Sequence, residues 1–131
     1  MNRLRVVVKK IDTLEGITKI VASCGNIPLS AITLELPKNI EAGNEAFFVF
    51  KETEVGIAKN LSGEISFSNL FEGKIADLTK GKILTKAVID IGGEEIVSIV
   101  TTDAALRLRL EINDTVTAFV KATEVSTEVS D

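Results

Sequence analysis

Segments rich in Val, Ile and Phe follow one another along the chain, and this pattern predicts strands over most of its length. Glycine and asparagine interrupt these segments at Gly16, at Gly25-Asn26 and over residues 42–44, as expected of turns between strands. The remaining connections are polar or glycine-containing. We expect strands over residues 4–14, 18–24, 29–36, 46–51, 71–78, 84–91, 95–101 and 115–121.

One connection carries a specific turn signal. Gly92-Gly93 stands between two runs of alternating hydrophobic and polar residues, within the sequence Asp90-Ile91-Gly92-Gly93-Glu94. Two glycines in this context predict a two-residue β-hairpin turn.

One segment has the character of a helix. Residues 102–108 contain good helix formers, and Thr102 or Asp103 is expected to cap the N-terminus. The corresponding part of the first half contains Pro37 and Gly43, so we expect no full helix there. Residues 54–68, between the two halves, contain both glycine and apolar residues and are expected to form a structured crossover.

The chain contains an internal repeat. Lys51-Glu52-Thr53-Glu54-Val55 returns as Lys121-Ala122-Thr123-Glu124-Val125, and a shift of 67 positions aligns Asn2 with Asn69 and Val8 with Ile75. By Lys51 the shift is 70, so the second copy has three extra residues between 101 and 114. We expect two domains, residues 1–60 and 64–131, of which the first has a degenerate opening motif.

Size and composition then narrow the fold. A half of this length buries only about 60% of its unfolded surface, so the halves are expected to pack together or to oligomerise. Only 5% of the residues are aromatic, which predicts an aliphatic core. Short strands with regular turns are typical of small five-stranded barrels of the oligonucleotide/oligosaccharide-binding (OB) type. We expect an all-β protein of two tandem OB-fold-like barrels, with a short helix in at least the second.

Several functions are disfavoured by what the sequence lacks. The net charge of −4 and the absence of a basic run argue against nucleic acid as a partner. The absence of histidine removes the commonest catalytic base and metal ligand, so we expect neither an enzyme nor a bound metal cation. The single Cys24 is expected to be a buried structural residue. No apolar run is long enough to span a membrane, and we expect a cytoplasmic protein without membrane insertion.

Small polar side chains beside lysines are the remaining candidates for a site. If each closing segment is a strand, Lys121 and Thr123 face one way while Ala122 and Glu124 face the other, and Lys51 and Thr53 are related in the same manner. Ser66 and Ser68 are likewise expected on one face. Ammonium and hydroxyl groups placed together are suited to binding a compact anion.

Three segments resemble the molybdate-binding Mop or TOBE-type repeats of molbindins. Residues 66–73 are similar to the family's opening Ser-Ala-Arg-Asn-x-Leu-x-Gly, and residues 121–125 to its closing Lys-Ala-Ser-x-Val. Residues 97–101 resemble its strand Ile-Thr-Ala-Ile-Val-Thr, which a short helix follows. The resemblance covers nearly all of the chain. It implies a cytoplasmic tandem molbindin that stores or buffers molybdate or tungstate as a ligand, with no cofactor.

The resemblance also implies where the anion binds. The sites would form where repeats meet between subunits, and six repeats would make a trimer of a two-repeat chain. Ser68 stands where the family has Arg, Glu52 replaces Ala, and only Met1 precedes Asn2 in the first copy. The implied oxyanion ligands are Ser66, Ser68 and Asn69 on one side and Lys121, Ala122 and Thr123 on the other, with Lys51 and Thr53 from the first copy.

Two functions of different classes remain open at this stage. The first is a free-standing protein for oxyanion storage or homeostasis. The second is an oxyanion-sensing or oligomerisation module that acts with a molybdate-responsive regulator or a molybdate transporter ATPase.

Overall fold

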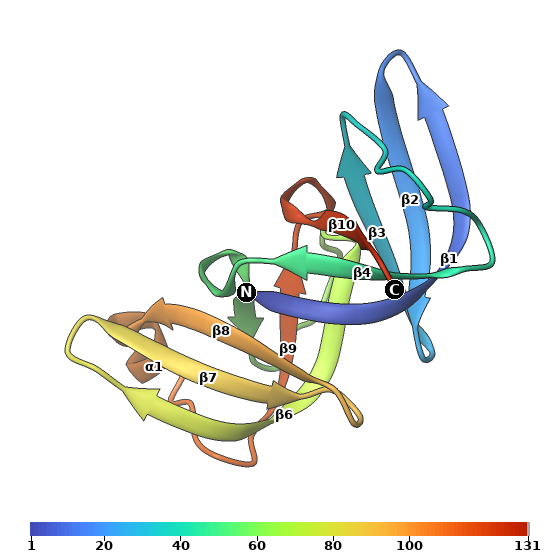
Figure 1. Ribbon diagram of the computed structural model, residues 1–131. Coiled ribbons are helices and arrows are strands. Elements are labelled where there is room, and N and C mark those ends of the chain that lie inside the picture. The colour runs from blue at the N-terminus through green and yellow to red at the C-terminus, as the bar shows by residue number, and fades with distance from the viewer. Residues whose placement is uncertain (131) are drawn as a thin grey trace. The chain divides into compact units, whose positions relative to one another are not determined.

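The structure, a computed structural model, describes residues 1–130, and within them strands dominate (Figure 1). One α-helix, α1 (Thr102–Arg107), and two 3₁₀ turns, η1 (Glu52–Glu54) and η2 (Ala122–Glu124), complete the regular structure of these residues. The strands are β1 (Asn2–Leu14), β2 (Ile17–Cys24), β3 (Ile27–Thr33), β4 (Glu45–Phe50), β5 (Gly56–Ala58), β6 (Asn69–Lys80), β7 (Leu84–Asp90), β8 (Glu95–Thr101), β9 (Thr115–Val120) and β10 (Ser126–Val129).

The strands form two five-stranded sheets. Their orders are β10-β4-β1-β2-β3 and β5-β9-β6-β7-β8. Each of the eight predicted strands overlaps one of these, whereas β5 and β10 were not predicted. Those two strands have only three and four residues, too few for a hydrophobic period to stand out from the surrounding loop.

Each compact unit of the chain contains parts of both repeats. Unit 1 consists of residues 1–50, 67–69 and 120–131, and unit 2 of residues 51–66 and 70–119. The closing segment of each repeat, with its 3₁₀ turn and short last strand, therefore belongs to the unit built on the other repeat. In Figure 1 the red β10 lies beside β4, with which it pairs in antiparallel fashion. The sequence repeats and the compact units are two different divisions of the chain.

The core of each unit is mostly aliphatic, as the composition predicts, but three phenylalanines are also fully buried in it. In unit 1 alternate residues of β1 point inward, and they pack with inward residues of β2, β3 and β4. Cys24 is buried there, as expected. The largest fully buried side chains are Leu4, Val6, Val8, Ile20, Phe48 and Phe50 in unit 1, and Phe71, Ile75, Ile89, Ile96, Leu110 and Val116 in unit 2.

The first long strand of each repeat bulges at the same place. The register shifts between Val8 and Lys10 in β1 and between Ile75 and Asp77 in β6. The Val8 N–H donates to Asn44 O at 2.9 Å, and the Ile75 N–H donates to Asp114 O at 3.0 Å. A bulge bends a strand and increases its twist, which curves each sheet toward closure.

The predicted helix is present, but its cap is a different residue. The Thr101 Oγ1 accepts a hydrogen bond from the Ala104 N–H at 3.1 Å. Thr102, which was expected as a possible cap, instead donates its hydroxyl to Gly81 O at 2.8 Å. Residues 34–44 form no helix, as Pro37 and Gly43 suggested.

The predicted hairpin and crossover are both observed. Gly92 and Gly93 have φ of +106° and +102°, and the Ile91 N–H donates to Glu94 O at 2.9 Å across the turn between β7 and β8. The glycines are needed because side chains disfavour such φ values. The segment between the repeats contains the end of η1 and all of β5, so it is structured over that part.

Candidate functional site

The closing motif of each repeat is a turn, so the strand alternation expected for it is wrong. The N–H groups of Glu124 and Val125 donate to the carbonyls of Lys121 and Ala122 at 3.0 and 3.3 Å, which closes a 3₁₀ turn. Residues three apart are eclipsed in such a turn. Only Ala122–Glu124 have this geometry, while Lys121 before them is extended, so a strand's alternation cannot place Lys121 and Thr123 on one face.

The first copy has the same geometry. η1 covers Glu52–Glu54, and the Glu54 N–H donates to Lys51 O at 3.0 Å. Lys51 and Thr53 are exposed, as Lys121 and Thr123 are, while Ala122 is half-buried. The polar groups predicted for the site are accessible to solvent in both turns.

The opening motif is also not a strand at its start. Residues 66–68 are irregular, and β6 begins only at Asn69. The period-two argument that placed Ser66 and Ser68 on one face therefore does not apply. Both serines are exposed, and Phe67 between them is half-buried.

Asn69 is buried, and its side chain is bound to the backbone of β3. The Asn69 Oδ1 accepts the Ser30 N–H at 2.7 Å, and the Asn69 Nδ2 donates to Ser30 O at 2.9 Å. Only 1% of the residue is exposed. The amide thus pairs with the N–H and C=O of one residue of β3, as a neighbouring strand would, and it fixes the opening segment to that strand.

The closing turn meets the same strand in unit 1. η2 packs against β3, and the Lys121 Nζ lies 5.9 Å from the centroid of the Phe67 ring. Val125, at the end of the turn, is only 3% exposed and anchors the turn in the core. The structure therefore brings the opening residues 67–69 together with the closing residues 121–123, around β3.

The other predicted residues belong to unit 2. Lys51 precedes η1 and Thr53 lies within it, and this turn packs against β8. There the buried Ser98 hydroxyl donates to Val55 O at 2.7 Å and holds the end of the turn. Ser66 is the last residue of the unit 2 segment 51–66.

Sequence reasoning overlooked Phe67 and Ser98 near the two turns. Phe67 has a signal in the sequence, because it replaces the small Ala of the family's opening motif. Ser98 has none, since its position within a strand gives no hint of which carbonyl it binds.

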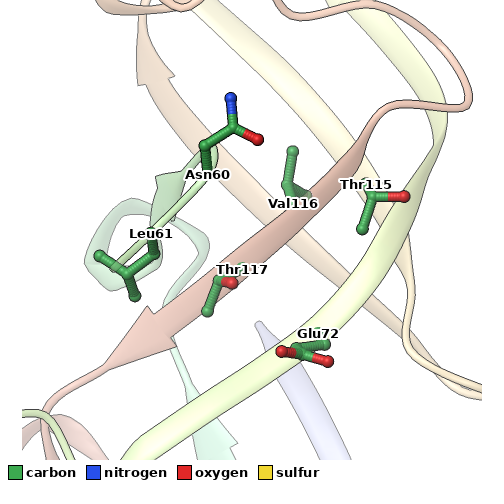
Figure 2. A pocket seen from close by; sticks show the side chains of 6 residues that line it. All are labelled: Asn60, Leu61, Glu72, Thr115, Val116 and Thr117. Carbon is green, nitrogen blue, oxygen red and sulfur yellow. The ribbon is translucent and has the colours of Figure 1, made fainter. Parts of the chain in front are cut away.

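Unit 2 carries a shallow pocket that includes none of the predicted residues. Its volume is about 220 Å³. Figure 2 shows Glu72 on β6 and the threonines of β9 in its wall, and the exposed carboxylate makes it a poor place for an anion. The pocket is lined by Asn60, Leu61, Glu72, Thr115, Val116 and Thr117.

Residues 1–130 contain neither a cluster of metal-ligating side chains nor a membrane-spanning helix. No group of three or more Asp, Glu, Cys or His side chains is arranged to hold a metal ion in this part of the chain. Among the same residues, no helix has the length and apolar character needed to cross a membrane.

Comparison with known proteins identifies the family. A sequence model of the TOBE domain matches residues 65–127. Molybdenum-pterin-binding protein 1 of Clostridium pasteurianum is 37% identical over 62 residues, which make up 47% of this chain and 91% of that protein. The chain belongs to the Mop/TOBE family. Molybdenum-pterin-binding protein 2 of the same organism matches this Mop/TOBE chain equally well.

Two other relatives of this Mop/TOBE protein differ in length. The molybdenum transport protein ModE of Herbaspirillum seropedicae is 35% identical over 71 residues, 53% of this chain but 26% of ModE, so the chain spans about a quarter of that protein. A crystal structure of the cytoplasmic molybdate-binding protein ModG, with molybdate bound, superimposes with a TM-score of 0.92 at 24% identity and covers 98% of this chain and 96% of its own. This likeness confirms the predicted fold of two tandem OB-fold-like units.

Proposed function

We propose that this protein binds molybdate or tungstate and serves in the intracellular storage or homeostasis of that oxyanion. The observation that carries the proposal is the meeting of the two family motifs in unit 1, where residues 67–69 and the turn after Lys121 lie against β3. The family membership supports the choice of ligand, because the relatives are described as molybdenum transport, molybdenum-pterin-binding and molybdate-binding proteins.

The chemistry of the closing turn suits a tetrahedral dianion. Such an anion has only acceptor oxygens, so it needs N–H, O–H and cationic donors. Lys121 supplies an ammonium group and Thr123 a hydroxyl, both exposed. The hydrogen bonds that close the turn are donated by the N–H groups of Glu124 and Val125. The N–H groups of Ala122 and Thr123 do not take part in closing it. We propose these groups as ligands.

The opening motif contributes in two ways in this proposal. The hydroxyl and backbone N–H of Ser68 donate directly, whereas Ser66 belongs to unit 2 and stays a prediction from the family resemblance. Asn69 acts through its backbone and by fixing the segment to β3, because its side-chain amide is already bound to Ser30.

The assembly is part of the proposal. A second subunit completes each site, and the two-repeat chain forms a trimer. Lys51 and Thr53 present the same exposed donors in η1, and we propose that they form a weaker half-site. Sedimentation equilibrium of the purified protein gives the mass directly, and a monomer at micromolar concentration would contradict the trimer.

A second function is favoured by one observation. The match to ModE covers only 26% of that transport protein, so a segment like this one also occurs within a longer chain. In this alternative the protein is a sensing or oligomerisation module that works with a regulator or a transporter ATPase. The full length of the gene and its neighbours discriminate between the two functions.

Titration with three oxyanions tests the proposed binding. Molybdate and tungstate are expected to raise the melting temperature, whereas the smaller sulfate is not, because a rigid cavity lined with amides cannot shrink around it. A ligand at 100 times its dissociation constant stabilises the native state by about 2.7 kcal/mol. If neither molybdate nor tungstate stabilises the protein at millimolar concentration, the proposed binding is wrong.

Replacement of Lys121 tests the site itself. Lys121→Ala is expected to weaken molybdate binding about tenfold or more, because a hydrogen bond from a charged group contributes about 1.5–3 kcal/mol. The fold should persist, since the side chain is exposed. Isothermal titration calorimetry measures the loss. Lys51→Ala is the matched control in the other turn and should have a smaller effect, and Cys24→Ser should leave the affinity unchanged. Wild-type affinity in a folded Lys121→Ala protein would refute the site.

A further inference from the structure

We propose that Phe67 is a positioning residue that holds the Lys121 ammonium in place for the oxyanion. This inference rests on the proposed function and adds a specific role for a residue that departs from the family's opening motif. The Lys121 Nζ lies 5.9 Å from the Phe67 ring centroid, within the roughly 6 Å over which an ammonium is attracted to an aromatic face.

Both partners of this contact are anchored through neighbouring residues. Asn69, two residues after Phe67, is bound to the N–H and C=O of Ser30 by two hydrogen bonds. Lys121 immediately precedes η2, which the buried Val125 attaches to the core. The flexible part is the four-carbon stem of Lys121, which is exposed and has many rotamers in the absence of a partner. The ring reduces that freedom before the anion arrives.

An aromatic ring suits this task better than a carboxylate does. A carboxylate would neutralise the ammonium and would place further acceptor oxygens where the anion must bind. The ring attracts the cation through its quadrupole and carries no net charge. The full positive charge of Lys121 therefore remains available to the dianion.

The differences from the family motif explain why the contact between Phe67 and Lys121 would matter. The family has Ala-Arg where this chain has Phe67-Ser68, so the second repeat lacks the arginine of the opening segment. With that charge absent, the placement of the remaining cation has more influence on affinity. Restricting Lys121 in advance lowers the entropy that binding would otherwise cost.

Calorimetric titration of the full chain with molybdate tests the role. Phe67→Leu keeps an apolar side chain but removes the π face, and it is expected to weaken binding about two- to fivefold. Phe67→Tyr keeps the ring and should retain the wild-type affinity. Phe47→Leu is the matched control, because Phe47 is the ring beneath Arg3 and Arg5 at 3.8 and 4.8 Å, and its loss should leave the affinity unchanged.

A double-mutant cycle separates positioning from a general structural effect. In the Lys121→Met background, Phe67→Leu is expected to cause no further loss of affinity. Melting-temperature shifts at millimolar molybdate keep this weak binding measurable. Wild-type affinity in Phe67→Leu, or an equal loss with and without Lys121, overturns the inference and leaves the proposed function standing. A wild-type protein that binds no oxyanion overturns both.

Discussion

At the residue scale, the buried polar side chains are the most informative positions. Asn69 lies in the interior and completes the backbone hydrogen bonding of Ser30 in β3. Its counterpart at the start of the first repeat, Asn2, is also buried. A buried polar group is tolerated only when its hydrogen bonds are made, so an asparagine at this point is a structural requirement of the second repeat as well as part of its motif.

Removal of the Asn69 amide is expected to be costly. Asn69→Ala leaves the Ser30 N–H and C=O without their partner and should lower the free energy of unfolding by about 2–3 kcal/mol. Urea denaturation measures the change. Ser30→Ala is the control, because it keeps the backbone N–H and C=O of residue 30 and should cost far less. Equal effects of the two substitutions would show that the side-chain amide is not what stabilises this region.

Thr127, unlike Asn69, has a buried polar atom whose hydrogen bonds are not made within the described residues. Its Oγ1 is buried and has no hydrogen-bond partner among residues 1–130. Thr127→Val removes this unpaired hydroxyl at nearly constant volume and is expected to raise the free energy of unfolding by about 1 kcal/mol.

Thr85→Val is the matched control for that substitution. Thr85 is fully buried, and its hydroxyl lies 2.9 Å from Thr102 Oγ1, which itself donates to Gly81 O. Loss of the Thr85 hydroxyl should destabilise the protein by about 1 kcal/mol. Chemical denaturation should show a higher free energy of unfolding for Thr127→Val and a lower one for Thr85→Val. A destabilised Thr127→Val protein would contradict the prediction for Thr127.

At the element scale, the end of α1 depends on a lysine from a distant part of the chain. The Lys59 Nζ donates to Leu108 O and Arg109 O at 2.9 Å each, and it pairs with Asp114 Oδ2 at 2.9 Å. Carbonyls at the end of a helix have no partner within the helix. One residue that follows β5 thus completes the bonding of a helix from the other repeat.

Lys59→Met is expected to destabilise unit 2 by about 1–2 kcal/mol, because it keeps the apolar stem but removes these hydrogen bonds. Hydrogen exchange at the α1 amides and urea denaturation both report the change. Lys82→Met, at an exposed lysine of the same unit, is the control and should have little effect.

The same contact gives a dependence on pH. The Lys59 ammonium, and after it the Glu111 N–H, hold the pKa of Asp114 below its usual value of 3.8. A carboxyl with a lowered pKa in the folded state stabilises the protein above its unfolded pKa, and this stabilisation is lost as the pH falls through the folded pKa. Stability should therefore drop below about pH 4, less steeply in Lys59→Met. An unchanged slope would contradict this assignment.

The sequence predicted elements well and their partners poorly. Eight strands and α1 follow from local composition and turn signals, since a hydrophobic period and a Gly-Gly turn act over a few residues. The pairing of Asn69 with Ser30 and of Lys59 with Asp114 depends on which distant segments the fold brings together. The closing motif was misjudged for a related reason, because Lys121–Val125 continues directly from β9 and only its backbone hydrogen bonds distinguish a turn from a strand.

At the scale of the whole molecule, the exchange of closing segments links the two units through the chain. The first residue of β6, Asn69, belongs to unit 1, and the rest of that strand belongs to unit 2. Likewise β9 lies in unit 2 except for its last residue, Val120, which belongs to unit 1. Neither unit is therefore an independent stretch of sequence. The two are expected to lose their structure together.

Single cooperative unfolding is the testable result. Thr127→Val in unit 1 and Lys59→Met in unit 2 should each shift one common thermal transition, upward and downward respectively. Native-state hydrogen exchange should give core amides of β2 and β7 similar free energies of opening. Two resolved transitions, or a substitution that affects only the amides of its own unit, would contradict the coupling.

The order in which a ribosome makes the chain gives the exchange another meaning. β4 can pair with β10 only after every residue of β5–β9 has been synthesised. Unit 2 needs no residue beyond Phe119, so it can be completed while unit 1 still lacks an edge strand. At about 5–20 residues per second, the 79 residues between the end of β4 and the end of β10 take about 4–16 seconds, during which β4 remains uncovered. An uncovered strand edge is a point of aggregation, so the nascent chain is most vulnerable in the half that was made first.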